Sequence, residues 1–288
     1  MKPEDVKTVG VAGCGIMGSG IVEVCAKVGL GVVSVEVDDE RMERGRAAVE
    51  RSLAKAVERG KLDDSDRQAA ASRISFSTDL GDFADVDLVI EAVTEDLTVK
   101  KQVFARLDEL IRPDVVLATN TSSLPIAELA AVTKRPDRVV GTHFFNPPPV
   151  MKLLEIIPAL TTSEETLAFA RGMGERLGKK TVLAKDRAGF IVNFLLMPYL
   201  NSAIRMLEEG FATREDIDTA IQLGLSHPMG PLTLLDFIGL DTALFVSKVI
   251  YDEFKDPDYA PPTLLKRMVA AGFLGRKSGK GFYDYGSE

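Results

Sequence analysis

The sequence predicts an α/β domain with a mostly parallel sheet, followed by an all-α domain. In the N-terminal half, short β-branched runs alternate with longer stretches of helical periodicity, which is typical of βαβ units around a parallel sheet. After Pro147 only two convincing strands remain, and helical periodicity dominates from about Gly189 onward. We therefore expect the first domain to cover residues 1–188 and the helical domain to cover residues 189–288.

The expected elements follow in order along the chain. Strands of the first domain are expected at 6–13, 31–37, 85–93, 115–120, 138–145, 150–157 and 181–184, and its long helices at 16–28, 39–59 and 97–111. Helices of the second domain are expected at 190–210, 213–225, 231–254 and 261–274. The apolar faces of these last helices are broad enough to pack on one another and on a second subunit.

Composition excludes several classes of function. The chain has 288 residues, of which 45% are hydrophobic, and a net charge of −8 without a long run of Lys or Arg, so nucleic acid is a poor partner. It contains no apolar stretch of about 18 residues, and its start lacks the order of a signal peptide, so we expect neither a membrane span nor secretion. Two cysteines, Cys14 and Cys25, are too few for a zinc site or a disulfide framework and indicate a reducing cytoplasm.

The segment VGVAGCGIMGSGI joins the first expected strand to the first helix. Gly13, Gly15 and Gly18 have the spacing of a dinucleotide-binding turn, in which the glycines permit the tight turn, the approach of a pyrophosphate and close helix packing. Ile16 and Met17 open the helix whose N-terminal N–H groups would face the phosphates. We expect these five residues to bind the cofactor.

A carboxylate, Glu36, ends the second strand at the distance from the glycines where a ribose-binding acid is expected. It would accept hydrogen bonds from the adenosine ribose and repel a 2′-phosphate, which favours NAD over NADP. Asp38 and Asp39 are near enough to make the same contact. The alternative is that the glycines serve only a tight turn and Glu36 only a solvated strand end.

The stretch THFFNPPPVMKLLE places one of only two histidines, His143, before three prolines, with Glu155 twelve residues later. Oxidation of a secondary alcohol needs a base near the hydroxyl, and histidine, with an ordinary pKa of about 6.5, suits this role. A carboxylate on the far ring nitrogen would fix the tautomer, and a return strand after the prolines would bring Glu155 alongside. The alternative, that His143 is a satisfied histidine at a strand end, is equally open from periodicity alone.

Further polar residues follow a buried-type strand. Asn120, Thr121 and Ser122 should lie at the carboxyl edge of the sheet, where ligands of open α/β folds bind. For Ser123 we expect the capping of the helix that begins in LPIAEL. Asn193 is polar inside an apolar helical stretch, so it must find a hydrogen bond in a ligand or in a neighbouring helix.

Taken together, GCGIMGSGI, EAVTEDLTVKK, NTSSLPI, THFFNPPPVMKLLEII, DRAGFIVN, LGLSHPMGP and RKSGKGFYDY resemble the 3-hydroxyacyl-CoA dehydrogenase family, most closely its bacterial 3-hydroxybutyryl-CoA branch. The resemblance covers about residues 6–285, with the motifs in family order. It implies a Rossmann-like N-terminal domain, NAD as cofactor, an acyl-CoA substrate that enters between the domains, and a homodimer formed through the helical domain.

The resemblance also implies roles for individual residues. His143 would be the catalytic base, Glu155 its orienting carboxylate, and Ser122 and Asn193 would contact the substrate. The residues implied on the cofactor side are Glu95, Lys100, Asn146 and Lys277, and we place Asn120, at the sheet edge, with them.

Two departures from the family pattern bear on ligand binding. Glu36 stands where the family usually has Asp, which leaves some use of NADP open. On the helix at 39–59, Ser52 is expected near the CoA nucleotide together with a basic residue, but Arg59 stands where lysine is expected, and Lys55 lies one turn before it. Either cation would bind phosphate, the first in forked geometry and the second as a point charge.

The sequence thus predicts an NAD-dependent (3S)-3-hydroxyacyl-CoA dehydrogenase that acts on the 3-hydroxybutyryl group. One alternative keeps the chemistry with another acyl group, such as 3-hydroxyadipyl-CoA. Two others are an L-gulonate 3-dehydrogenase and a non-catalytic NAD-binding protein on the same scaffold.

Overall fold

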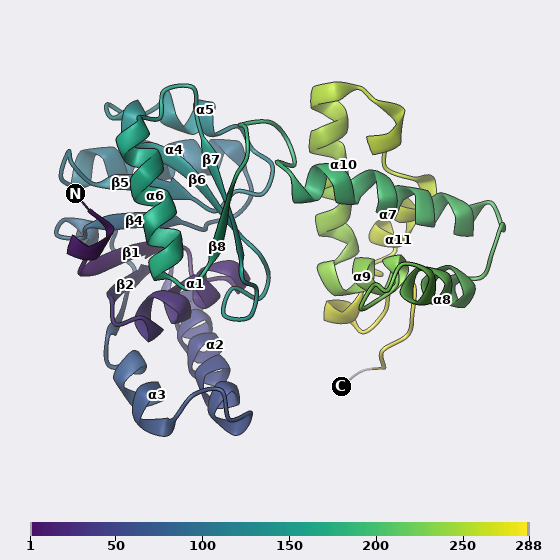
Figure 1. Cartoon of the computed structure of the whole chain (residues 1–288), viewed down its shortest axis with the longest axis horizontal. Helices are drawn as coiled ribbons and strands as arrows, with labels where there is room; N and C mark the ends of the chain where they lie inside the picture. The colour runs from purple at the N-terminus through teal and green to yellow at the C-terminus, as the bar shows by residue number, and fades with distance from the viewer. Residues whose placement is uncertain (1, 287–288) are drawn as a thin grey trace. The chain divides into compact units, whose positions relative to one another are not determined.

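A computed structural model describes residues 2–286 of the chain (Figure 1). Contacts divide the chain after Arg187 into two compact units, which we call unit 1 and unit 2. Among the described residues, no helix combines the length and the apolar character that crossing a bilayer would require.

The described residues of unit 1 form an eight-stranded sheet in the order β3-β2-β1-β4-β5-β6-β7-β8. Neighbouring strands are parallel throughout, except that β6 and β7 are antiparallel. The mostly parallel sheet expected from the sequence is therefore confirmed. The strands are β1 (Thr8–Ala12), β2 (Gly31–Val35), β3 (Ile74–Ser77), β4 (Leu88–Glu91), β5 (Val116–Thr119), β6 (Val139–Phe144), β7 (Leu153–Pro158) and β8 (Lys180–Leu183).

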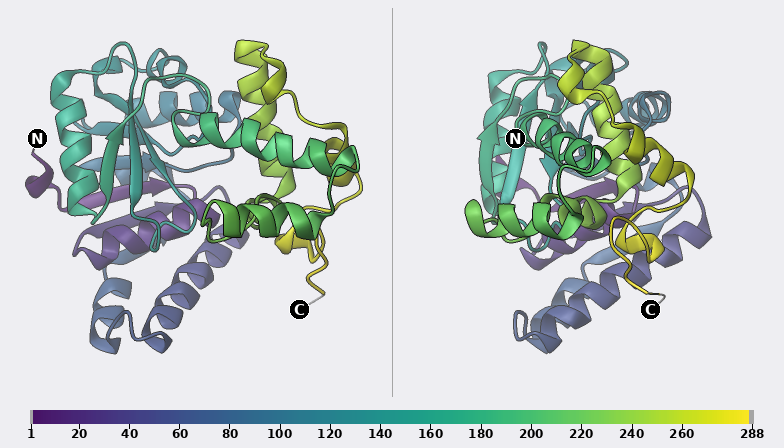
Figure 2. Two further views of the ribbon diagram at one scale, coloured as in Figure 1. Left: turned by 45° about the vertical axis from the view of Figure 1, so that its right-hand side comes forward. Right: turned by 90° about the vertical axis from the view of Figure 1, so that its right-hand side faces the viewer.

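Helices cover both faces of this sheet (Figure 2). Side chains fix the start of several of them: Asp38, Asp96 and Ser163 each accept the backbone N–H three residues further on, which satisfies a helix donor that would otherwise lack a partner. The α-helices are α1 (Ile16–Lys27), α2 (Asp39–Glu58), α3 (Asp64–Ala71), α4 (Leu97–Leu110), α5 (Ile126–Ala130) and α6 (Glu164–Arg176), with short 3₁₀ turns η1 (Pro3–Asp5), η2 (Leu80–Phe83) and η3 (Pro136–Arg138).

Strand β3 and helices α3 and α6 were not predicted from the sequence. The strand reads ISFS, and none of its four residues is fully buried, so it lacks an apolar run that would reveal it. It lies at the edge of the sheet and pairs only with β2. An edge strand can stay half exposed, which removes the pattern on which sequence recognition depends.

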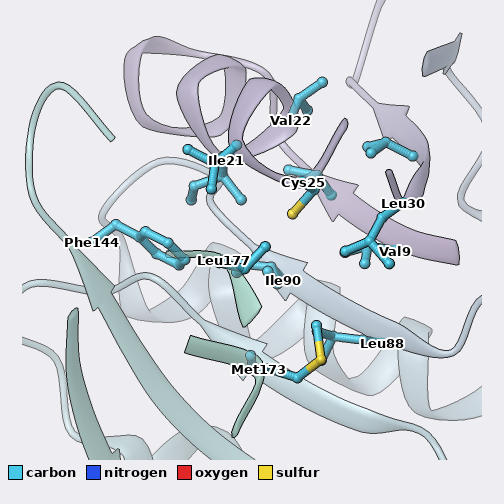
Figure 3. Packing of buried hydrophobic residues seen from close by; sticks show 14 of the residues in the cluster. Val9, Ile21, Val22, Cys25, Leu30, Leu88, Ile90, Phe144, Met173 and Leu177 are labelled. Carbon is cyan, nitrogen blue, oxygen red and sulfur yellow. The ribbon is translucent and has the colours of Figure 1, made fainter. Parts of the chain in front are cut away.

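One buried core of unit 1 lies between the sheet and helices α1, α2 and α6. Val9 of β1, Ile21 and Cys25 of α1, Phe144 of β6 and Met173 of α6 belong to one buried cluster (Figure 3). Burial raises the pKa of the Cys25 thiol to about 12, and both cysteines are free thiols inside the protein. Complete burial of such apolar side chains contributes about 1.5–3 kcal/mol each and keeps the sheet edges in a fixed position.

The described part of unit 2 is helical, as expected. Its α-helices are α7 (Val192–Glu208), α8 (Arg214–Gly224), α9 (Pro231–Ile238), α10 (Leu240–Phe254) and α11 (Thr263–Ala270), with 3₁₀ turns η4 (Pro257–Tyr259) and η5 (Arg276–Ser278). The helical pattern expected over 231–254 is interrupted at Gly239. The φ of this glycine is 99°, outside the helical region, so α9 ends and α10 begins there.

Two buried aspartates hold the C-terminal segment of unit 2. Asp218 accepts hydrogen bonds from the first N–H groups of α9 and from the hydroxyl of Tyr283, at 3.0 Å. Asp236 accepts the backbone N–H groups of Phe282 and Tyr283, each at 2.9 Å, and the hydroxyl of Tyr285 at 3.0 Å. Burial raises the pKa of Asp236. The segment GFYDY is thereby fixed to the helices of its own unit.

Candidate active site

The turn between β1 and α1 has the geometry that pyrophosphate binding requires. Gly13 has a φ of 92°, and a side chain there would meet the Ala92 carbonyl oxygen at 2.6 Å. An added Cβ at Gly18 would overlap the carbonyl of Gly13. At Gly15, by contrast, an added Cβ meets no atom of the described residues within 4 Å, so the backbone is open to a ligand. The turn therefore has the space that a dinucleotide needs.

Glu36 follows β2 directly and lies beside this turn. Its Oε1 accepts the backbone N–H of Cys14 at 2.6 Å, and its Oε2 accepts that of Val37 at 3.2 Å. Asp38 instead caps α2 and pairs with Arg41 at 2.7 Å. Of the acids that follow β2, Glu36 is thus the one whose carboxylate contacts the glycine turn, where the ribose of a dinucleotide would lie.

His143 and Glu155 face each other across β6 and β7. The two residues are directly opposite in the antiparallel pair, and opposite residues project from the same face of a sheet. The His143 Nδ1 atom lies 2.6 Å from Glu155 Oε2, with side-chain exposures of 7% and 0%. The ring centroids of Phe145 and His143 are 4.5 Å apart. A buried carboxylate in this position favours the tautomer that carries its proton on Nδ1.

The proline loop between β6 and β7 is held from two sides. Pro148 packs against Gly20 of α1, where an added Cβ would lie 2.6 Å from the proline ring. The buried ammonium of Lys179 donates hydrogen bonds to the carbonyl oxygens of Pro148 and Met151. Asn146 is an exposed residue of the same loop. The path of the chain after the histidine is therefore fixed by contacts with α1 and with the segment before β8.

Polar groups after β4 and β5 form a second cluster at the carboxyl edge of the sheet. Glu95 Oε1 accepts hydrogen bonds from Thr121 Oγ1 and Ser122 N, both at 2.7 Å, and from Ser122 Oγ at 3.1 Å. Asn120 Oδ1 accepts the backbone N–H of Phe144 at 2.9 Å. Asn120 thus joins the end of β5 to the strand that carries the histidine.

Lys100 is buried behind this cluster, with 1% of its side chain exposed. Its Nζ lies 2.6 Å from Glu91 Oε1, 3.3 Å from Glu95 Oε2 and 3.3 Å from the carbonyl of Val93. An ammonium has three N–H donors, and three protein oxygens surround this one. Lys100 was expected to line the cofactor site; in this structure its side chain is 1% exposed, whereas that of Glu95 is 26% exposed.

Ser123 does not cap α5, so that expectation was wrong. The helix begins at Ile126 and Pro125 occupies its N-cap position, so Ser123 lies two residues too early to cap it. Its first N–H groups donate instead to the carboxylate of Asp186, at 2.9 and 2.8 Å. The Ser123 hydroxyl is buried without a hydrogen-bond partner among residues 2–286. A cap supplied from 60 residues away leaves no local sequence signal.

Comparison with known proteins assigns the whole chain to one family. The family model for the 3-hydroxyacyl-CoA dehydrogenase NAD binding domain matches residues 8–187, and the model for the C-terminal domain of the same family matches residues 189–285. The chain belongs to the 3-hydroxyacyl-CoA dehydrogenase family. The family, the Rossmann-like fold and the NAD cofactor predicted from the sequence are thereby confirmed, as is the class of enzyme.

Individual members of the 3-hydroxyacyl-CoA dehydrogenase family are similar over their full length. The chain is 51% identical over 282 residues to the 3-hydroxybutyryl-CoA dehydrogenase of Mycobacterium tuberculosis, covering 97% of this chain and 99% of that protein. The crystal structure of M. tuberculosis FadB2 gives a TM-score of 0.96 at 51% identity and covers 98% of this chain and 99% of that one. The structure of (S)-3-hydroxybutyryl-CoA dehydrogenase from Ralstonia eutropha gives a TM-score of 0.92 at 46% identity, with coverage of 98% and 100%.

The residues expected near the CoA nucleotide lie on one face of helix α2 in this dehydrogenase. Ser52 is half-buried, and Lys55, one turn later, is exposed. Arg59, exposed, is the residue that ends the helix. Residues three and four apart on a helix are neighbours, so Lys55 lies beside Ser52 on one side and Arg59 on the other.

Two expected ligand contacts belong to unit 2. Asn193 is half-buried and lies in the first turn of α7, two residues nearer to the start of the helix than the expected bounds placed it. The helix starts at Val192 rather than at residue 190 because Phe190 has a φ of 47°, in the left-handed region that a right-handed helix does not accommodate. The Lys277 ammonium pairs with the Asp241 carboxylate, with Nζ 2.6 Å from Oδ2.

Sequence reasoning missed Glu91 and Thr119, which contact each other behind the site. Glu91 is the last residue of β4 and is fully buried, and it accepts a hydrogen bond from the Thr119 hydroxyl at 2.6 Å. The available signal was an acidic residue at the end of the apolar run DVDLVIEAV, because a charge in a buried strand requires partners.

Proposed function

We propose that the chain interconverts (3S)-3-hydroxybutyryl-CoA and acetoacetyl-CoA with NAD. The single observation that carries this proposal is the buried 2.6 Å contact of His143 Nδ1 with Glu155, on the sheet whose carboxyl edge also bears the open glycine turn. The acyl group is proposed because the relatives from M. tuberculosis and R. eutropha are named 3-hydroxybutyryl-CoA dehydrogenases. A different acyl group, such as 3-hydroxyadipyl, is the main alternative, because the chemistry at C3 would be the same.

In the proposed oxidation, neutral His143 accepts the proton of the 3-hydroxyl group on Nε2. Glu155 accepts the hydrogen bond from Nδ1–H, which fixes the tautomer, and its negative charge stabilises the imidazolium that forms. When bound, NAD accepts the hydride that leaves C3. In the reverse direction the imidazolium returns its proton to the oxygen of the 3-oxo group.

We assign supporting roles to the neighbouring residues. Ser122 orients the 3-oxygen of the substrate, and Glu95 and Asn120 shape the nicotinamide side of the site, together with Asn146. Cations at Lys55 and Arg59, together with Ser52, bind the phosphates of CoA. The roles expected for Asn193 and Lys277 toward substrate and cofactor stay predictions.

Cofactor choice follows from Glu36 in this proposal. Its carboxylate already accepts one N–H of the glycine turn, so it is held where the ribose hydroxyls would approach. A 2′-phosphate would meet this negative charge, and the nearby cation, Arg41, is paired with Asp38. We therefore expect NADH to be used much faster than NADPH.

The first experiment is to measure the initial rate of NADH oxidation with acetoacetyl-CoA, beside NADPH and beside free acetoacetate. A fast rate only with NADH and the thioester supports the reaction, the role of Glu36 and the need for CoA. Faster turnover of a dicarboxylyl or longer thioester would replace the proposed acyl group. Absence of any rate, from folded protein that binds NADH, would refute the proposed function.

The chain offers a matched control for the histidine. We expect His143→Gln to lower turnover by about 10²–10⁴-fold, the usual contribution of a general acid or base, while NADH affinity stays nearly unchanged. The other histidine, His227, is exposed, so His227→Gln should keep wild-type turnover. Near-normal turnover of the His143 variant would exclude it as the base.

We also propose that the enzyme is a homodimer formed through unit 2. Exposed apolar side chains there include Leu195, Phe211 and Leu223, exposed by 67%, 76% and 80%, and a second subunit would remove such apolar surface from water. Light scattering should report twice the chain mass. Leu223→Glu should weaken the dimer, whereas Leu160→Glu, at a 97% exposed position of unit 1, should not.

The cellular location we propose is the reducing cytoplasm. Both cysteines are buried free thiols, which suits a compartment that keeps thiols reduced. Cell fractionation with an antibody to the protein would test this, and recovery outside the cytoplasm would refute it.

A further inference from the structure

The fully buried carboxylate of Glu91 has no part in the reaction proposed above. Its Oε1 accepts hydrogen bonds from Lys100 Nζ at 2.6 Å and from the Val93 backbone N–H at 2.7 Å, and its Oε2 accepts the Thr119 hydroxyl at 2.6 Å. These three donors compensate the loss of hydration that a buried carboxylate suffers. Glu91 lies at the carboxyl end of β4, directly beneath the polar cluster of the candidate site.

Lys100 connects Glu91 to the site. Its ammonium lies closer to Glu91, at 2.6 Å, than to Glu95, at 3.3 Å. Two carboxylates therefore share one ammonium, and the group as a whole carries one net negative charge. Glu95, with 26% of its side chain exposed, is the most accessible of the three, so that charge is presented toward the site.

Glu95 is held through both of its oxygens. Oε2 contacts the ammonium of Lys100, while Oε1 accepts the hydrogen bonds of Thr121 and of the Ser122 backbone and hydroxyl. Any displacement of the ammonium toward Glu95 would rotate the carboxylate and change its bonds to the serine. The distance between the ammonium and Glu95 is set by the competing attraction of Glu91.

We infer that Glu91 is a positioning residue, which holds the Lys100 ammonium so that Glu95 keeps its charge and its orientation toward Ser122. This inference rests on the proposed roles of Glu95 in cofactor binding and of Ser122 in substrate binding. Without the Glu91 carboxylate, Lys100 has Glu95 as its only nearby carboxylate within this cluster and moves toward it. The consequence is a misplaced site on an otherwise intact sheet.

The test compares two buried ion pairs of unit 1. Glu91→Gln removes one charge behind the site, and Asp108→Asn removes one charge from the Asp108–Arg135 pair, 2.7 Å apart with exposures of 4% and 8%, which has no contact with the site residues. We expect Glu91→Gln to raise the NADH dissociation constant about tenfold and to lower kcat/KM about 100-fold, since a displacement of about 1 Å can have that effect. Asp108→Asn should lower Tm but leave both kinetic quantities within about twofold.

A second variant separates positioning from support of the fold. If Glu91 acts through Lys100, then adding Glu91→Gln to Lys100→Met should change NADH affinity and kcat/KM by less than about twofold. It should also raise Tm relative to Lys100→Met, because it removes an unpaired buried charge. The inference would be overturned if the double variant recovered kcat/KM together with Tm, or if its kcat/KM fell much further than that of Lys100→Met. Normal kinetics of Glu91→Gln alone would also overturn it.

The NADH measurement keeps this inference separate from the proposed reaction. NADH fluorescence reports binding without turnover, so the effect of Glu91→Gln on affinity can be read from any folded preparation. An inactive wild-type protein whose NADH affinity still depends on Glu91 would refute the proposed substrate and leave the positioning role supported.

Discussion

Replacement of Glu155 by glutamine tests the charge of the acid/base pair, because the two side chains have nearly the same shape and the amide keeps one oxygen that can accept the Nδ1–H hydrogen bond. In the proposed transition state the imidazolium of His143 and the carboxylate of Glu155 form a fully buried ion pair, with Nδ1 and Oε2 2.6 Å apart. With about 4 Å between charge centres and an effective dielectric constant of about 20, the attraction is about 4 kcal/mol. Its loss corresponds to about a thousandfold in kcat, at about 1.4 kcal/mol per tenfold.

Steady-state reduction of acetoacetyl-CoA, followed by the absorbance of NADH, measures this loss. We expect kcat of Glu155→Gln to fall by about 10²–10³-fold and the NADH dissociation constant to change by less than about twofold. The double variant His143→Gln/Glu155→Gln should lose no more than His143→Gln alone, because the glutamate acts only through the histidine. If the two losses multiply, or if Glu155→Gln keeps a third of wild-type kcat, the proposed role of the carboxylate is wrong.

Two further variants test the cofactor turn and the response of the fold to acid. Gly15→Ala should raise the NADH dissociation constant by about tenfold, because the added Cβ would prevent the close approach of the pyrophosphate to the backbone. Tm should shift by less than about 2 °C, since an added Cβ meets no atom of the described residues within 4 Å and the φ of Gly15 is −69°. A lower Tm with unchanged NADH affinity would contradict this prediction. Burial opposes ionisation of Asp87, but hydrogen bonds from the backbone N–H groups of Lys7 and Thr8 and from Arg112 outweigh it and lower its pKa. The stabilisation of the folded state by ionised Asp87 is complete at neutral pH and is lost as the pH falls below about 3.9 and then through the lowered pKa. In urea unfolding, Asp87→Asn should therefore be less stable than wild type at pH 7 and equally stable in strong acid.

The parts of the site that local chemistry determines were predictable from the sequence. The glycine spacing of GCGIMG predicts a turn whose atoms leave room at Gly15 and almost none at Gly18, and the structure has this distribution of space. An acid after the second strand must lie near that turn because parallel strands share a carboxyl edge, and Glu36 contacts Cys14. In both cases the interacting residues lie within a single βαβ unit, so the prediction depended only on residues close together in the chain.

The parts that depend on distant partners were not predictable. Ser123 is of a residue type that commonly caps helices, but the Asp186 carboxylate accepts the first N–H groups of α5 instead. Lys100 was expected at the cofactor site, but it is buried against Glu91, whose own burial depends on the Thr119 hydroxyl, 28 residues further along the chain. The local sequence predicts a side chain's usual role, and contacts with other segments of the chain changed that role at both of these positions.

The geometry of the base follows from how β6 returns as β7. Eight residues, 145–152, join the two strands, and a parallel return would need a crossover of about a dozen residues or more. The link therefore requires the antiparallel pair that places Glu155 opposite His143. Because side chains alternate faces along a strand, a slip of one residue in this register would turn the carboxylate to the other face of the sheet and leave the imidazole without it. The contacts of Pro148 with Gly20 and of Lys179 with the loop carbonyls hold the link at both sides, so the loop fixes the register and, through the register, the tautomer of the proposed base.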